Sequence, residues 1–430
     1  MGENRHQSGE YWSIDISQEN NFEEVLEPGT DCCIYRVPQF LRKINEEAYT
    51  PSLISIGPLH YSRKELMGME KQKKRFWSKF WERVNNAQKL VEFKIYIKNQ
   101  EQRIRDHYSV FSTLQSSEYV AMIQRDAVFI IELFIRNYDR TEEFLLDSPS
   151  LDASITADLL LLENQVPYFV LNHLYTEAFL SSEEKPSFFV LSVSYLCGIM
   201  DFNLRSFLDA AEPQVKHFTD LLRCAFVMQV FQPAGSNGDR VFDFPSATKL
   251  NESGLNFIGI KDKCYLDITL VQRKFGKWLP WFKVNELRIP QIKIFDETER
   301  LFRNMMALEL LYCPRQTHIR SYAKLMDCLI DTVKDVDLLV EKGIIVNCVG
   351  DNEVITKMFN TLGTNMIFGN SRYYDIVKRM KKHYKYAWNH AKARLRSAYF
   401  SNLWTGTATV GATFLLILTV IQTVCSIMQL

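Results

Sequence analysis

The sequence lacks a net charge, because 51 basic residues balance 51 acidic residues among its 430 positions. A protein dedicated to nucleic acid usually carries a strong positive field, so we expect no nucleic-acid partner. The first residues are polar and contain no apolar stretch of the kind found in secretory signal peptides. We therefore expect no route into the secretory pathway at this end of the chain.

Motifs that carry known chemistry are also absent. The nine cysteines form no C-x-x-C pair, and their odd number is typical of buried thiols in a reducing compartment. There is no G-x-G-x-x-G, no G-x-x-x-x-G-K, no G-x-S-x-G, no H-E-x-x-H and no EF-hand loop. We therefore expect no enzyme activity, and we assign no catalytic residue, no metal ligand and no cofactor.

Charge is missing once more at the end of the chain, where no residue after Arg396 is acidic or basic. A bilayer's hydrocarbon layer of about 30 Å requires about 20 apolar residues, and residues 403–428 exceed that length. We predict a transmembrane anchor there, with Tyr399, Phe400 and Trp404 at the lipid headgroups. A buried terminal helix is the alternative. Small residues along the anchor also permit a homo-oligomer formed through it.

A strongly basic segment precedes the predicted anchor. Its basic residues are Lys378, Arg379, Lys381, Lys382, Lys385, Lys392, Arg394 and Arg396. Such residues stay on the cytoplasmic side and attract anionic lipids. We therefore expect membrane lipid as a partner and a single-pass anchor with a cytoplasmic body, in the plasma membrane rather than an endomembrane. The alternative is a helix face that is simply solvated.

What is present in the rest of the chain is mostly helical periodicity. Phe76, Phe80 and Val84 recur four residues apart, and Glu70 and Lys74 can pair at the same spacing. Similar patterns predict helices over residues 119–133, 213–229, 298–312, 322–340, 353–362 and 371–400.

Between residues 266 and 294 the period becomes two, which predicts a small antiparallel sheet with the Pro290 strand at its edge. The expected fold is mainly α (α+β): a large multi-helix globular domain with a small antiparallel β element and one C-terminal transmembrane helix. We divide the chain into a flexible polar segment (1–30), the globular domain (31–400) and the anchor (403–428).

Several polar residues interrupt apolar helix faces. Asp126 falls within the stripe that contains Ile123 and Ile130, where an unpaired carboxylate would cost several kcal/mol. Asp126 therefore needs a partner, and Arg125 points away from that stripe.

Glu163, Asn164 and Gln165 follow a run of leucines in the same way. One hypothesis makes them and Asp126 a buried polar network that fixes the helices, with Arg36 as a counter-ion. The other makes them the floor of a ligand pocket.

Seven segments, spread in order over nearly the whole chain, carry a resemblance to a known family. They are IYRVPQFLRKINEEAYTPSLISIGPLHY (34–61), MEKQKKRF (69–76), RDAVFIIELF (125–134), DLLLLENQVPYFVL (158–171), SATKLNESGLNF (246–257), LRIPQIKI (287–294) and DVDLLVEKGII (335–345). They resemble a plant-specific family of uncharacterised proteins, domain of unknown function 247, also called UPF0481. Ala127 and Val128 depart from its usual pattern, and residues 274–283 look like an insertion.

The resemblance implies one α-rich domain followed by a membrane anchor, and it supplies no catalytic residue. Some relatives are associated with pollen–pistil self-incompatibility. We therefore expect a membrane-anchored plant protein that acts in recognition, signalling or as a scaffold, and that binds an unknown protein partner. The alternative is a membrane-bound enzyme or small-ligand receptor with a polar pocket around Asp126 and Glu163.

Overall fold

The computed structural model describes residues 29–179, 185–200, 207–208, 212–228, 244–261, 263–275, 279–386 and 403–428. Helices dominate this part of the chain. They are α1 (Gln39–Arg42), α2 (Gly68–Val84), α3 (Ala87–Asp106), α4 (Ser116–Tyr138), α5 (Phe144–Asp147), α6 (Pro149–Leu159), α7 (Tyr168–Phe179), α8 (Phe188–Leu196), α10 (Phe218–Val227), α11 (Ala247–Glu252), α12 (Thr298–Leu311), α13 (His318–Leu329), α14 (Val333–Glu341), α15 (Asn352–Leu362), α16 (Tyr374–Lys385) and α18 (Leu403–Met428), with the 3₁₀ helices η1 (Glu47–Tyr49), η2 (Lys64–Leu66) and η3 (Cys197–Met200).

Two small sheets accompany the helices. Their strands are β1 (Asn256–Ile260), β2 (Thr269–Phe275), β3 (Leu279–Pro290), β4 (Ile292–Ile294) and β5 (Ile345–Asn347). The first sheet has the order β1-β3-β2, in which β2 runs antiparallel and β1 parallel to β3, and the second is a parallel β4–β5 pair. The expected antiparallel pairing is confirmed for β2 and β3, but β1 joins the sheet in parallel, and the strand that ends at Pro290 is central, not at the edge as expected. Pro290 lies on the central strand, but it is that strand's last residue, where a missing N–H interrupts no ladder.

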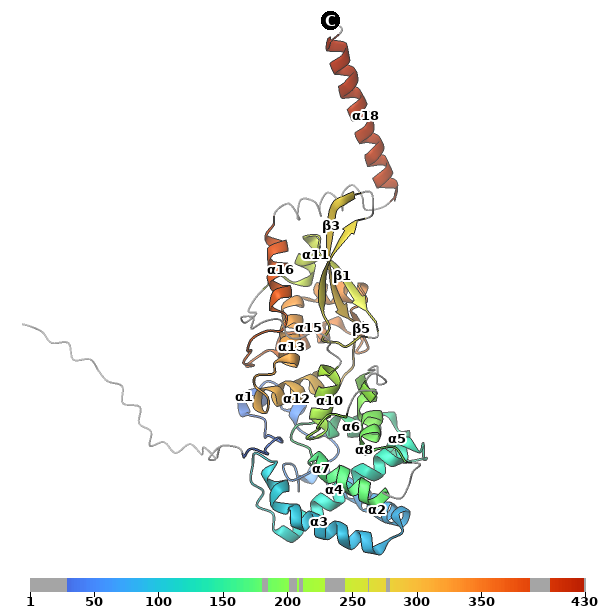
Figure 1. Cartoon of the computed structure of the whole chain (residues 1–430), viewed down its shortest axis with the longest axis vertical. Coiled ribbons are helices and arrows are strands. Elements are labelled where there is room, and N and C mark those ends of the chain that lie inside the picture. The colour runs from blue at the N-terminus through green and yellow to red at the C-terminus, as the bar shows by residue number, and fades with distance from the viewer. Residues whose placement is uncertain are drawn as a thin grey trace, which may run out of the picture.

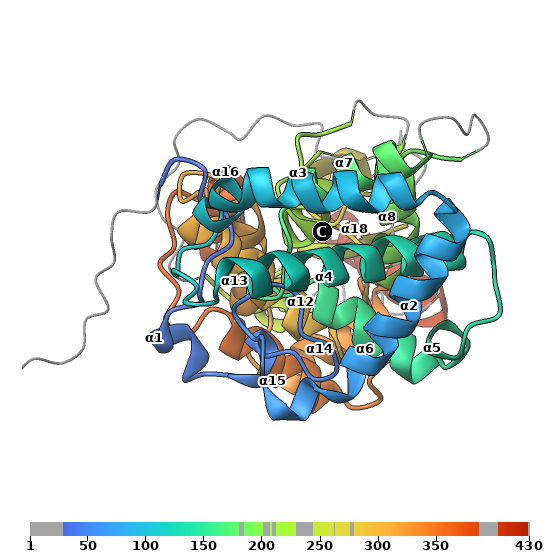
Figure 2. The ribbon, with the colours of Figure 1, turned by 90° about the horizontal axis from the view of Figure 1, so that it is seen from below.

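Helix α4 is the centre of the amino-terminal half, and most of its residues from Tyr119 to Arg136 are buried. It packs against α2, α3, α7 and α8. Figure 2 shows α3 and α4 running side by side on one face, with α2 crossing beside them. Figure 1 shows these helices at one end of the body and the sheets toward the other, with α10 and α12 between. Helix α12 joins the two halves, because it contacts η1, α10, α13 and α15.

Two expected helices have different limits. The predicted helix over 322–340 is two helices, because Thr332 and Asp335 form a capping box that starts α14 after α13 has ended. Pro213 does not open a helix, because α10 begins five residues after it, at Phe218, behind the N-cap residue His217.

The predicted membrane anchor is not supported. A span needs about 20 consecutive apolar residues, and among the described residues no helix has the length and apolar content to cross a bilayer. Threonines and glycines interrupt the apolar run in the first half of α18. The expected single-pass localisation with a cytoplasmic body is therefore not supported either. The alternative of a buried terminal helix is not observed, because the large apolar side chains from Phe414 to Val424 are between 45% and 65% exposed.

The basic segment is only partly described. Lys378, Arg379, Lys382 and Lys385 are exposed on α16, and Lys381 is half-buried. Trp404 lies in the first turn of α18. The other members of these two predicted sets, Lys392, Arg394, Arg396, Tyr399 and Phe400, lie outside the described residues, as do positions 1–28 of the predicted flexible segment.

Candidate functional site

Residues 50–60 form a buried connecting segment between η1 and η2 that belongs to no helix or strand. Its backbone N–H groups donate hydrogen bonds to side chains from distant elements. Asp158, at the end of α6, accepts those of Ser52, Leu53 and Ile54 at 2.9, 2.7 and 2.8 Å. Arg300 of α12 forms an ion pair with the same carboxylate at 2.6 Å. Asp158 therefore replaces the sheet or helix partners that this segment lacks.

Asn164 and Asp126 continue this pattern along the segment. Asn164 accepts the N–H of Ile56 at 2.7 Å and donates to the carbonyl of Ile54 at 2.9 Å. Asp126 accepts the N–H of Gly57 at 2.9 Å. Gly57 has φ +72°, and a Cβ there would lie 2.3 Å from the carbonyl oxygen of Gln165. Only glycine allows this close approach without strain.

The partner of Asp126 is Lys73 of α2. The Lys73 ammonium lies 2.7 Å from an Asp126 oxygen and 2.7 Å from Glu70, and it also donates to the carbonyl of Ser55. Burial raises the pKa of Asp126 above its usual value, although Lys73 and the Gly57 N–H act in the opposite direction. Arg125 is paired with Glu70 at 2.9 Å instead.

Glu163 has a different counter-ion from the one we expected. Its carboxylate accepts the N–H of Val37 at 2.6 Å, pairs with Arg42 and lies 3.2 Å from His60 Nε2. Arg36 is exposed, because the segment is extended there and successive side chains point to opposite sides, with Val37 inward. Burial tends to raise the pKa of Glu163, but its three polar contacts hold it below the usual value.

Gln165 completes the set of predicted polar residues. Its amide group donates to the carbonyls of Leu159 and Leu161 at 2.6 and 2.7 Å and accepts the N–H of Phe218 at 2.9 Å. Asp126, Glu163, Asn164 and Gln165 are all at least 98% buried. Neither of the two cavities described below includes Asp126 or Glu163 in its wall.

Sequence reasoning missed Lys73, Arg42, Asp158 and Arg300. Lys73 left a usable signal, because it lies four residues after Met69 and three before Phe76 on one buried helix stripe. A lysine at such a position needs a buried anion. The other three leave no comparable signal in the sequence.

The described residues contain no group of three or more His, Cys, Asp or Glu side chains placed to hold a metal ion. Burial also raises the pKa of the Cys197 thiol to about 12. Because the thiolate is the nucleophilic form, this cysteine is unreactive near neutral pH.

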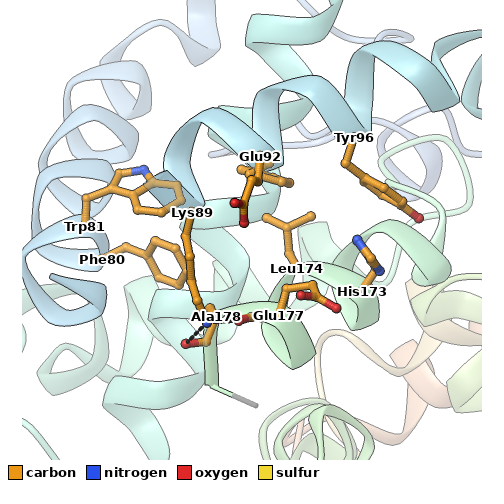
Figure 3. Close-up of a pocket in the computed structure, with 10 residues that line it drawn as sticks. Phe80, Trp81, Lys89, Glu92, Tyr96, His173, Leu174, Glu177 and Ala178 are labelled. Carbon is orange, nitrogen blue, oxygen red and sulfur yellow. Dashed lines mark hydrogen bonds between the residues drawn. The ribbon is translucent and has the colours of Figure 1, made fainter. Parts of the chain in front are cut away.

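A surface pocket of about 220 Å³ lies between α2, α3 and α7. We call it the aromatic pocket. Its wall is made by Phe80, Trp81, Lys89, Glu92, Phe93, Tyr96, His173, Leu174, Glu177 and Ala178. Figure 3 shows Trp81 and Phe80 on one side and Tyr96, stacked on His173, on the other.

Charged side chains surround these rings. Lys89 reaches from α3 across to α7, where it donates to the backbone carbonyls of Glu177 and Ala178 (Figure 3). The carboxylates of Glu92 and Glu177 are exposed, and within the described part of the chain neither forms an ion pair. Aromatic rings beside unpaired carboxylates suit a cationic side chain, through both charge and cation–π attraction.

The comparisons with known proteins identify the family. The family model described as DUF247, plant protein of unknown function, matches residues 34–418, so the chain belongs to this family and the resemblance is confirmed. A UPF0481 protein of Arabidopsis thaliana is 27% identical over 422 residues, covering 93% of this chain and 87% of the relative. A putative UPF0481 protein of the same plant is 23% identical over 492 residues, covering 94% and 91%. No solved structure matches the chain.

Proposed function

We propose that this plant protein acts in recognition or as a scaffold, and that its helical body binds a protein partner through the aromatic pocket. The observation that supports this role is the cluster of Trp81, Phe93 and Tyr96 beside the carboxylates of Glu92 and Glu177. Neither carboxylate forms an ion pair among the described residues, and Glu92 accepts one hydrogen bond, from Gln88 at 3.2 Å. Aromatic residues supply most of the energy at protein interfaces. A lysine or arginine side chain of the partner complements this pocket.

Binding is favoured over catalysis because the buried acids are already occupied. Asp126 and Glu163 each accept a backbone N–H group and pair with a basic side chain. A general acid or base has to reach a substrate proton. These two carboxylates instead hold the fold together.

The test is affinity capture from plant tissue with the full chain and two variants. The double variant Glu92→Lys, Glu177→Lys reverses the charge of the aromatic pocket. The control Glu142→Lys makes the same exchange at an exposed position before α5, outside the pocket. We expect wild type and the control to capture the same protein in stoichiometric amount, and the double variant to bind it at least tenfold more weakly.

Equal binding of that protein by all three chains contradicts the proposal. The proposal is also contradicted if none of the three chains captures a protein in stoichiometric amount. Circular dichroism of the double variant has to match wild type, because both substitutions are on exposed positions.

A further inference from the structure

A second cavity, of about 320 Å³, lies where residues 55–67 meet the first turns of α2 and the side of α4. We call it the cationic pocket. Arg63, Lys64, Lys74 and Arg125 contribute basic side chains to its wall, and Glu70 contributes the only carboxylate. It lies at the first half of α2, whereas the aromatic pocket lies at the second half, and the two share no residue.

The residues that line this pocket do not neutralise its positive charge. Glu70 already binds Lys73 at 2.7 Å and Arg125 at 2.9 Å. Arg63, Lys64 and Lys74 form no ion pair within the part of the chain that the structure describes. Three cations around one concave site focus the field and attract an anion.

Ser55 provides an independent sign of a ligand. Its side chain is 94% buried, it lines the cavity, and its hydroxyl has no hydrogen-bond partner among the described atoms. A buried hydroxyl without a partner costs about 1–3 kcal/mol. Its position is fixed from behind, because its backbone carbonyl accepts the Lys73 ammonium. The hydroxyl oxygen itself is covered, so an oxygen atom in the cavity would satisfy it once the Ser55 side chain rotates toward the cavity.

The start of α2 adds to the attraction. This helix of 17 residues has Met67 at its N-cap, without a side-chain cap, and Met67 is part of the cavity wall. The first N–H groups of a helix lack intrahelical partners and carry a partial positive charge. They favour an anion in the space that they face.

We propose that the cationic pocket binds the phosphate group of a small phosphorylated molecule. A phosphate dianion matches the three unpaired cations, and its oxygens accept from the guanidinium groups and from the Ser55 hydroxyl. The cavity is larger than a bare phosphate and lies at the lower limit of small-molecule sites, about 300 Å³. Tyr61, Leu66 and Met67 line the remainder and offer contacts to the organic part. This site is separate from the partner docking proposed above.

The test uses calorimetric titration of the full chain with ribose 5-phosphate, inorganic phosphate and, for comparison, ribose. The variants are Lys74→Glu and Ser55→Ala. Lys94→Glu is the control, because it makes the same charge change at an exposed position on α3 outside the cavity.

We expect both phosphates to bind wild type and the control, and ribose not to bind. Lys74→Glu weakens binding at least thirtyfold. Ser55→Ala weakens it about tenfold without any change in net charge, a result that nonspecific attraction to basic residues would not give. Tighter binding of ribose 5-phosphate than of inorganic phosphate assigns the site to a phosphate ester, and equal binding assigns it to free phosphate.

Two results overturn the proposal: no binding of either phosphate to wild type, or equal binding to wild type and both pocket variants. Thermal unfolding of Ser55→Ala checks the fold. This variant should remain as stable as wild type without ligand, since it removes a hydroxyl that has no partner.

Discussion

The ion pair between Lys73 and Asp126 allows us to predict how much the free energy of unfolding falls when either partner is replaced. Both side chains are at least 98% buried and lie 2.7 Å apart. Lys73→Met leaves Asp126 with one remaining contact, the N–H of Gly57, and removal of one partner from a buried pair costs about 3–5 kcal/mol. Asp126→Asn should cost less, about 2–3 kcal/mol, because Lys73 keeps Glu70 and the Ser55 carbonyl as partners.

The double variant decides whether this reasoning holds. Lys73→Met with Asp126→Asn buries no unpaired charge, so its loss should be smaller than the sum of the single losses by about 2 kcal/mol. Urea unfolding of the four proteins at pH 7 measures this coupling. Additive losses, or a Lys73→Met loss below about 1 kcal/mol, would refute the claim that the two charges depend on each other.

Three other changes should also reduce stability. Burial lowers the pKa of His217 from 6.5 to about 4. The contribution of this residue to the free energy of unfolding is therefore complete above pH 6.5, and about 3 kcal/mol of it is lost as the pH drops to 4. Unfolding curves of His217→Asn should lack this part of the pH dependence. Gly57→Ala should cost about 3 kcal/mol from the positive φ and the clash with a backbone carbonyl, measured by urea unfolding. Asp158→Ala leaves three backbone N–H groups without their acceptor and removes the buried ion-pair partner of Arg300. A thermal scan should show a loss of more than about 4 kcal/mol, or no folded protein.

Periodicity in the sequence located most helices because it depends on neighbours in the chain. Phe76 and Phe80 predicted the helix that is observed as α2, and both side chains are buried. The first and last residues of the helices were less predictable. The capping box at Thr332 and Asp335, for example, divides one continuous apolar pattern into two helices. A period of two located strands, but it does not name their partners. The parallel pairing of β1 with β3 was therefore missed.

The candidate site shows the same division. The burial of Asp126 and Glu163 followed from their apolar surroundings in sequence. Their counter-ions did not, because Lys73 is 53 positions from Asp126. The expected counter-ion was Arg36, but Arg42, which lies six positions later in the same segment, reaches the Glu163 carboxylate from α1. Both cavities combine residues from separate helices, so no local motif announces them.

The buried connecting segment has a consequence for protein synthesis. Thr50 and Ala48 offer carbonyls to Arg300 and Asn304, partners that lie 250 and 256 positions later in the chain. A ribosome builds the chain from its amino terminus, adding about 5–20 residues each second. The early segment therefore waits at least ten seconds for these partners. Until then these two carbonyls lack their final partners, and the last steps of folding follow the synthesis of α12.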